Sequence, residues 1–379
     1  MALNCWLKDQ VHRYGVGIPR LFLITGEYGH SKPGKDPAAD QKGKVLDYRI
    51  SLNDGALETD SERKFEMLYK VKKQRLTNGE TLSYREAGRN RKLTIFLIHG
   101  NQSSSFFFEF LMKKLEIKAH VYAVDLAGFG GSTYQKPHET LKAWAEDVAL
   151  FMDELEIPPA IVLGWSAGGG VAMELAAGYP EKVLHLIPVA SVGVKGFKMP
   201  KLDLALNPVP GRFLSEREEI FRDPYVVAGE SAIRAENAKV FRTVWEQKIF
   251  DLHAPEDSLF DAYMQEILKE RCLSDICLAL CRFNITHEKD LVEGSGRISD
   301  IQCPVTWIHG REDQSVPFET GEDSVTYFES PAEFCLIENA GHAVFLDQPQ
   351  EFETILSRIM QEEDRKDAKS LVQKMTLEE

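Results

Sequence analysis

The sequence predicts an α/β protein with a mostly parallel central sheet, helices on both faces of that sheet and a helical cap insertion. Short apolar runs alternate with segments of helical spacing, and this alternation implies right-handed crossovers between parallel strands. It stops near Ser191 and resumes near Val305. The 379 residues are 43% hydrophobic and 27% charged, which is enough apolar material for a large core.

The chain opens with an N-terminal extension, residues 1–66, that is partly irregular and shows no clear periodicity. Two strands are expected after it, at Val71–Leu76 and Thr81–Glu86. The Asn78-Gly79 pair between them supplies the positive φ angles of a tight hairpin turn.

Residues 67–190 are predicted to form the first part of the core. Leu93–Ile98 is apolar throughout, as expected for a strand that is buried on both faces. A helix follows this strand, and the alternation then continues. Its further elements are strands at Ala119–Val124, Ala160–Leu163 and Val183–Val189, and helices within 138–156 and at Ala167–Tyr179.

Residues 191–300 interrupt the alternation because they lack buried-strand runs. They contain amphipathic helical stretches at Ala235–Phe250 and Leu259–Cys281. We therefore predict that this segment forms a helical cap over the strand ends.

The second part of the core is predicted at residues 301–362. Its elements are strands at Val305–Ile308 and Glu333–Ile337, a helix near Gly321–Phe328 and a last helix from about Glu351. The charged C-terminal tail, residues 363–379, is compatible with a helix and is expected to be solvated.

The net charge of −14 argues against a nucleic-acid partner. Residues 1–100 carry 18 basic and 12 acidic side chains, so the rest of the chain holds an excess of about 20 negative charges. Such a surface repels polyanions and favours small, neutral or weakly charged substrates. The chain has no apolar run near the roughly 20 residues that span a bilayer and no signal-peptide pattern, so a cytoplasmic protein is expected.

Six cysteines in a chain of this length do not form a disulfide scaffold. Cys272, Cys277 and Cys281 cluster in a helical stretch, where buried thiols are the expected interpretation. No His or Cys pair at zinc-site spacing accompanies them, so neither a metal nor another cofactor is predicted.

Gly164-Trp165-Ser166-Ala167-Gly168 is the strongest local signal. It lies between a predicted strand and a predicted helix. A serine at the tip of such a turn has strained dihedral angles and needs small residues two positions away on either side. The pattern therefore predicts that Ser166 is a nucleophile.

Asp313 and His342 are the candidate partners of this serine. Each lies just beyond a predicted strand, at the sheet edge that also holds Ser166, and the order serine, acid, histidine is that of the strand-to-helix elbow. Glu312 is the alternative acid. His309, at the end of its strand, is interpreted as structural.

The oxyanion of an acyl-transfer reaction needs two N–H donors. The backbone N–H of Ala167 is one candidate, and that of Asn101, in the loop after Leu93–Ile98, is the other. Asn101 also begins an Asn-Gln-Ser glycosylation sequon. A glycan there would block the site, and a cytoplasmic location removes this conflict.

From about Lys72 to Met360 the chain resembles the α/β-hydrolase superfamily. The matching motifs are His99-Gly100, the segment from Asp125 to Ser132, the serine elbow, and the segments around Asp313 and His342. The elbow and the His-Gly-Asn opening resemble esterase-like members that include N-acyl homoserine lactonases.

This resemblance implies a serine hydrolase of carboxylic esters or lactones with an apolar acyl part. Thioester and carbon–carbon bond hydrolysis share the same triad, and a ligand receptor with little turnover is the alternative from another class. Candidate substrate contacts are Trp165, Phe106 and Phe107, although helix packing also accounts for the phenylalanines. The sequence assigns no oligomeric state.

Overall fold

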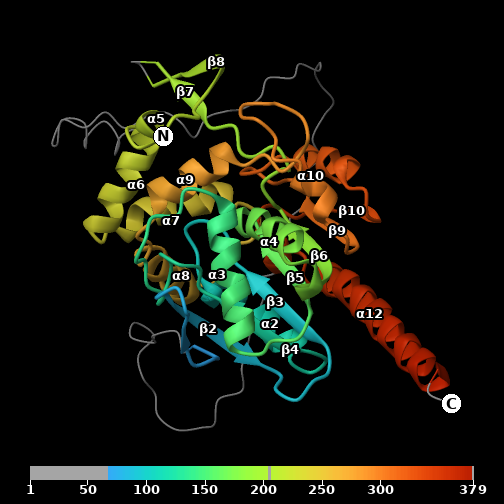
Figure 1. Ribbon diagram of the computed structural model, residues 1–379. Coiled ribbons are helices and arrows are strands. Elements are labelled where there is room, and N and C mark those ends of the chain that lie inside the picture. The colour runs from blue at the N-terminus through green and yellow to red at the C-terminus, as the bar shows by residue number, and fades with distance from the viewer. Residues whose placement is uncertain (1–66, 204–205, 378–379) are drawn as a thin grey trace, which may run out of the picture.

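The computed structural model describes residues 67–203 and 206–377 (Figure 1). The predicted N-terminal extension lies outside these ranges. No described helix combines the length and the apolar character needed to cross a membrane.

An eight-stranded sheet forms the centre of the molecule, in the order β1-β2-β4-β3-β5-β6-β9-β10. β1 and β2 pair antiparallel, as do β2 and β4, and the other neighbours are parallel. The strands are β1 (Lys72–Arg75), β2 (Thr81–Ala87), β3 (Thr94–Ile98), β4 (His120–Val124), β5 (Ala160–Trp165), β6 (Val183–Val189), β9 (Val305–Gly310) and β10 (Ala332–Ile337). The predicted fold class, a mostly parallel sheet covered by helices, is confirmed.

Helices cover both faces of the sheet because side chains alternate across each strand. In β5, Val162 packs into the apolar cluster under α3 and α4, whereas Leu163 packs into the cluster under α2 and α12. These helices are α2 (Glu109–Leu115), α3 (Leu141–Glu154), α4 (Ala167–Gly178) and α12 (Pro349–Leu377). Thr140 caps α3 by accepting a hydrogen bond from the N–H of Ala143.

Between β6 and β9 the chain leaves the sheet and forms an insertion, which holds α6 to α9 together on one side of the strands (Figure 1). Its elements are β7 (Pro200–Leu202), β8 (Pro208–Phe213), α5 (Arg217–Ile220), α6 (Pro224–Arg234), α7 (Ala238–Lys248), α8 (Asp257–Ile267), α9 (Leu273–Arg282) and the 3₁₀ turn η3 (Arg297–Asp300).

The insertion differs from the sequence prediction in two places. The single helical stretch expected at Leu259–Cys281 is two helices, α8 and α9. They separate where the backbone N–H of Arg271 donates to the carbonyl of Gly128, in the loop after β4. The β7–β8 hairpin was not predicted, because its short, mostly exposed strands contain proline and no apolar run.

The core resumes with β9, α10 (Phe318–Ser324), the 3₁₀ turn η4 (Val325–Tyr327) and β10. A short helix, α11 (Val344–Asp347), then leads into α12, which runs beyond the sheet at its C-terminal end (Figure 1). One continuous helix therefore joins the last part of the core to the segment expected to be a tail.

Candidate active site

Ser166 lies at the turn between β5 and α4, with φ 56° and ψ −121°. A side chain in this region of φ is strained, so the surrounding structure must hold it there. The Ser166 N–H donates to the carbonyl of Val189 at 2.9 Å, and the Ser166 carbonyl accepts from Gly169 and Val192. These bonds fix the turn and leave the side chain on the outside of the bend.

Close backbone approach explains the glycines around this turn. A Cβ on Gly164 would lie 2.3 Å from the carbonyl oxygen of Gly168, and a Cβ on Gly168 would lie 2.4 Å from that of His99. A Cβ on Gly100 would lie 2.8 Å from the Cβ of Ser166. The loop after β3 thus packs directly against the elbow, which requires glycine at all three positions.

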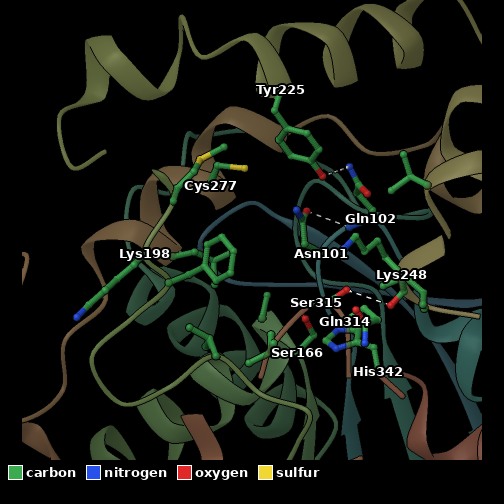
Figure 2. A pocket seen from close by; sticks show the side chains of 18 of the residues that line it. Asn101, Gln102, Ser166, Lys198, Tyr225, Lys248, Cys277, Gln314, Ser315 and His342 are labelled. Atoms are coloured by element: carbon green, nitrogen blue, oxygen red, sulfur yellow. Dashed lines mark hydrogen bonds between the residues drawn. The ribbon is translucent and has the colours of Figure 1, made fainter. Parts of the chain in front are cut away.

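Asp313 and His342 meet although they follow different strands. Nδ1 of His342 and Oδ2 of Asp313 are 2.8 Å apart, and both side chains are buried. The other ring nitrogen, Nε2, is not used in this pair, and His342 lines the same cavity as Ser166 (Figure 2). The indole N–H of Trp165 donates to the carbonyl of His342 at 2.9 Å and ties the histidine loop to the elbow.

The environment of Asp313 keeps its carboxylate ionised. Burial alone would raise the pKa, but attraction to His342 and hydrogen bonds from His309 and His342 outweigh it and leave the pKa well below its usual value. The other oxygen, Oδ1, accepts from the backbone N–H groups of Ser315 at 2.7 Å and Val316 at 2.8 Å. The carboxylate therefore has a fixed orientation.

His309 is a second histidine on this carboxylate. Its Nδ1 accepts from the indole N–H of Trp307 at 3.3 Å, so Nε2 carries the proton. That nitrogen lies 2.9 Å from the carbonyl of Val316 and 3.2 Å from Oδ2 of Asp313. The structural role predicted for His309 thus includes holding Asp313, which the sequence did not indicate.

Glu312, the alternative acid, points to a different partner. Its Oε2 accepts from the backbone N–H of Ala340 at 3.1 Å, in the loop that leads to His342. Glu312 supports this loop, and the carboxylate that pairs with His342 is that of Asp313.

Asn101 and Ala167, the two expected oxyanion donors, both border the cavity at Ser166. Ala167 is the first residue of α4, so its N–H has no carbonyl one turn earlier in the helix. The side-chain oxygen of Asn101 accepts from the N–H of Gln102 at 2.9 Å, and Gln102 has φ 53°. The loop therefore turns sharply beside Ser166.

The neutral, buried ring of His99 holds this loop in place through hydrogen bonds to two loops. Burial lowers the pKa of His99 despite the attraction of Asp125. Its Nε2 accepts from the N–H of Leu126 at 3.0 Å, so the protonated Nδ1 donates to the carbonyl of Gly100 at 2.7 Å. The His-Gly motif thereby connects the loop after β3 to the loop after β4.

The cavity has a volume of about 490 Å³ and lies between the strand ends and the insertion. Its walls are mostly apolar. Trp165 lines it, and the insertion contributes residues from α6, α7 and α9 whose inward direction the sequence left open. Val244, Trp245 and Lys248 occupy one face of α7, and Ile249 follows at its C-terminal end. Helical spacing could have identified that face, but not the surface that it meets.

Phe106 and Phe107 do not line this cavity. Both are buried, and the ring of Phe107 stacks on that of Tyr263 with centroids 4.2 Å apart and contacts Trp245 at 5.1 Å. The Phe106 ring meets Tyr263 edge-on at 5.4 Å. The structure brings these phenylalanines together with α7 and α8, and not with Ser166.

Among the described residues, no group of three or more His, Cys, Asp or Glu side chains is placed to hold a metal ion. Cys272, Cys277 and Cys281 are buried free thiols, and burial raises the pKa of each. They are inert wall and core residues.

Fold and site together place a serine at a strand-to-helix elbow, with a histidine–aspartate pair at the same cavity. A sequence model of the alpha/beta hydrolase family matches residues 95–355, and the chain belongs to this family.

Curated relatives include esterases and acyltransferases. The chain is 27% identical over 259 residues to a pimeloyl-(acyl-carrier protein) methyl ester esterase of Neisseria meningitidis, covering 68% of this chain and 90% of the relative. It is 26% identical over 276 residues to a 1-acylglycerol-3-phosphate O-acyltransferase of Arabidopsis thaliana, covering 68% of this chain but only 63% of that protein. An esterase structure from Exiguobacterium antarcticum has a TM-score of 0.59 at 19% identity, over 76% of this chain and 98% of the other, and supports the fold alone.

Proposed function

We propose that the protein hydrolyses carboxylic esters or lactones with an apolar acyl part through an acyl-enzyme on Ser166. The observation that carries this proposal is the 2.8 Å pair of His342 and Asp313 at a cavity that also holds Ser166. The mostly apolar walls suit an acyl chain, and the insertion would act as the cap that closes over it. The family's esterase members support the same reaction class.

In the first step the Ser166 oxygen forms a bond to the carbonyl carbon while its proton passes to Nε2 of His342. Asp313 holds the ring and stabilises its positive charge. The N–H groups of Asn101 and Ala167 stabilise the negative charge on the carbonyl oxygen. The bond to the leaving alkoxide then breaks, and His342 returns the proton to that oxygen.

Water completes the cycle. His342 takes a proton from water as the water oxygen attacks the acyl carbon, and the proton passes to the Ser166 oxygen when the acyl bond breaks. With a lactone substrate the leaving oxygen stays attached to the acyl chain, so the product is a single hydroxy acid.

The test treats the purified protein and its Ser166→Ala variant with a fluorophosphonate probe. We expect labelling of the wild type alone, followed by turnover of p-nitrophenyl esters and lactones with a chain-length preference set by the cavity. A folded wild-type protein that does not react would contradict the proposal. Equal labelling of both proteins would assign the nucleophile to another residue.

A further inference from the structure

Among the described residues that line the cavity, lysine is the one formally charged residue type. Lys198 and Lys248 both border it, and none of the described lining residues is Asp or Glu. The whole chain shows the opposite balance, with 59 acidic and 45 basic residues. A positive cavity wall in an acidic protein is a local feature that the net charge conceals.

The two lysines differ in the partners and directions of their ammonium groups. Nζ of Lys198 lies 2.8 Å from Oδ2 of Asp290, and the side chain leads away from Ser166 (Figure 2). Lys248 makes no ion pair with any described residue, and its side chain reaches into the cavity beside Asn101 and Gln102 (Figure 2). Lys198 is thus paired with a carboxylate, whereas Lys248 forms no ion pair within the described part of the chain.

The backbone of Lys248 is held against the catalytic loop. Its carbonyl accepts from the hydroxyl of Ser315 at 3.2 Å, and the N–H of Ser315 donates to Asp313. Asp251, three residues further on, is close enough for Lys248 to lower its pKa, although burial raises that pKa overall. The backbone of Lys248 is therefore held in place, while the N–H donors of its ammonium group can bind a ligand.

A half-buried ammonium beside apolar walls is a favourable partner for a bound anion. A bound ester that carries a carboxylate or a phosphate would supply that anion, while its acyl chain contacts the apolar walls. Charge-assisted hydrogen bonds of this kind are about twice as strong as neutral ones.

Building on the proposed hydrolase function, we propose that the substrate is an ester with an anionic group and that Lys248 binds this group. The shared chemistry is a carboxylate or phosphate on a flexible chain. Lys248 is then the residue that selects such esters over neutral esters of the same length.

The experiment compares kcat/KM for matched pairs of esters. One arm pairs methyl esters of monocarboxylic acids with monomethyl esters of dicarboxylic acids over a series of chain lengths. The other arm pairs a monoacylglycerol with the same acylglycerol 3-phosphate. We expect the wild type to prefer the anionic member in at least one arm, and the arm identifies the anion.

Lys248→Met should lower the anionic-to-neutral ratio by about tenfold or more, while Lys248→Arg should retain it. Lys198→Met is the matched control, and its ratio should equal that of the wild type because Asp290 already neutralises Lys198. No anionic preference in the wild type, or an equal loss in the two methionine variants, would overturn the inference.

Fluorophosphonate labelling separates this inference from the proposed function. A wild type that reacts with the probe but does not distinguish the paired esters refutes the role of Lys248 alone. A wild type that fails to react refutes the hydrolase proposal itself.

Discussion

At the residue scale, the geometry distinguishes two neighbouring carboxylates. Asp313 pairs with Nδ1 of His342, whereas Glu312 accepts only from a loop N–H. Asp313→Asn should lower kcat by about 10⁴-fold, because an amide does not hold the histidine in the required tautomer. Glu312→Gln keeps an acceptor for Ala340 and should change kcat less than about threefold.

Steady-state kinetics on a p-nitrophenyl ester measure both variants, with circular dichroism as the check on folding. If Glu312→Gln were the severe change and Asp313→Asn the mild one, the acid would be Glu312.

Residue types in motif order made Ser166, Asp313 and His342 predictable. Each lies in the turn or loop that follows a strand of the parallel part of the sheet, which brings all three to one edge. The contact between His309 and Asp313 was not predictable, because it depends on a side-chain direction at the end of β9. The position of Lys248 at the cavity was not predictable for a related reason, since it depends on how α7 packs over the strand ends.

At the element scale, one aromatic cluster joins the insertion to the core. Phe107 stacks on Tyr263 of α8 and contacts Trp245 of α7, and Ser104 donates to Glu266 at 2.9 Å beside them. The short 3₁₀ turn η1 (Ser105–Phe108) thus holds the insertion over the strand ends.

Phe107→Ala should lower the free energy of unfolding by about 3–5 kcal/mol, as expected for removal of a fully buried ring. Urea denaturation measures this loss, and Phe107→Leu should lose less because it leaves a smaller cavity. A loss below about 1 kcal/mol for the alanine variant would mean that the insertion is not held by this contact.

Strands and helices of the core were predictable because their apolar spacing is strong. The break between α8 and α9 was not, since the residues there include neither glycine nor proline and the separation depends on a hydrogen bond to Gly128. The β7–β8 hairpin lacks a buried face, which is the signal that identifies a strand.

At the scale of the whole molecule, the buried Glu270 makes stability depend on pH. Its carboxyl oxygens have no hydrogen-bond partner of normal geometry among the described residues. Burial raises its pKa from 4.5 to about 8, and the nearby N–H of Gln102 and the charge of Arg271 offset this only in part. The folded state therefore keeps a proton that the unfolded chain releases above pH 4.5.

The stabilisation from this proton is complete below the unfolded pKa and is lost as the pH rises through about 8. The glutamine in Glu270→Gln does not ionise. The free energy of unfolding of this variant should therefore exceed that of the wild type by an amount that grows between about pH 5 and 9. Each pKa unit corresponds to about 1.4 kcal/mol, which makes the gain a few kcal/mol. Urea denaturation of both proteins at several pH values measures it, and a constant difference would contradict the assignment.

The link between Trp165 and the carbonyl of His342 joins positions 177 residues apart in the chain. During synthesis the elbow serine therefore emerges well before His342, its proposed base, and at 5–20 residues per second this interval lasts roughly 10 to 35 seconds. A nascent chain in this period carries Ser166 without the His342–Asp313 pair and with an incomplete cavity. Hydrolytic activity would begin only when the last strands reach the sheet, so a prematurely terminated chain that lacks them would be inactive.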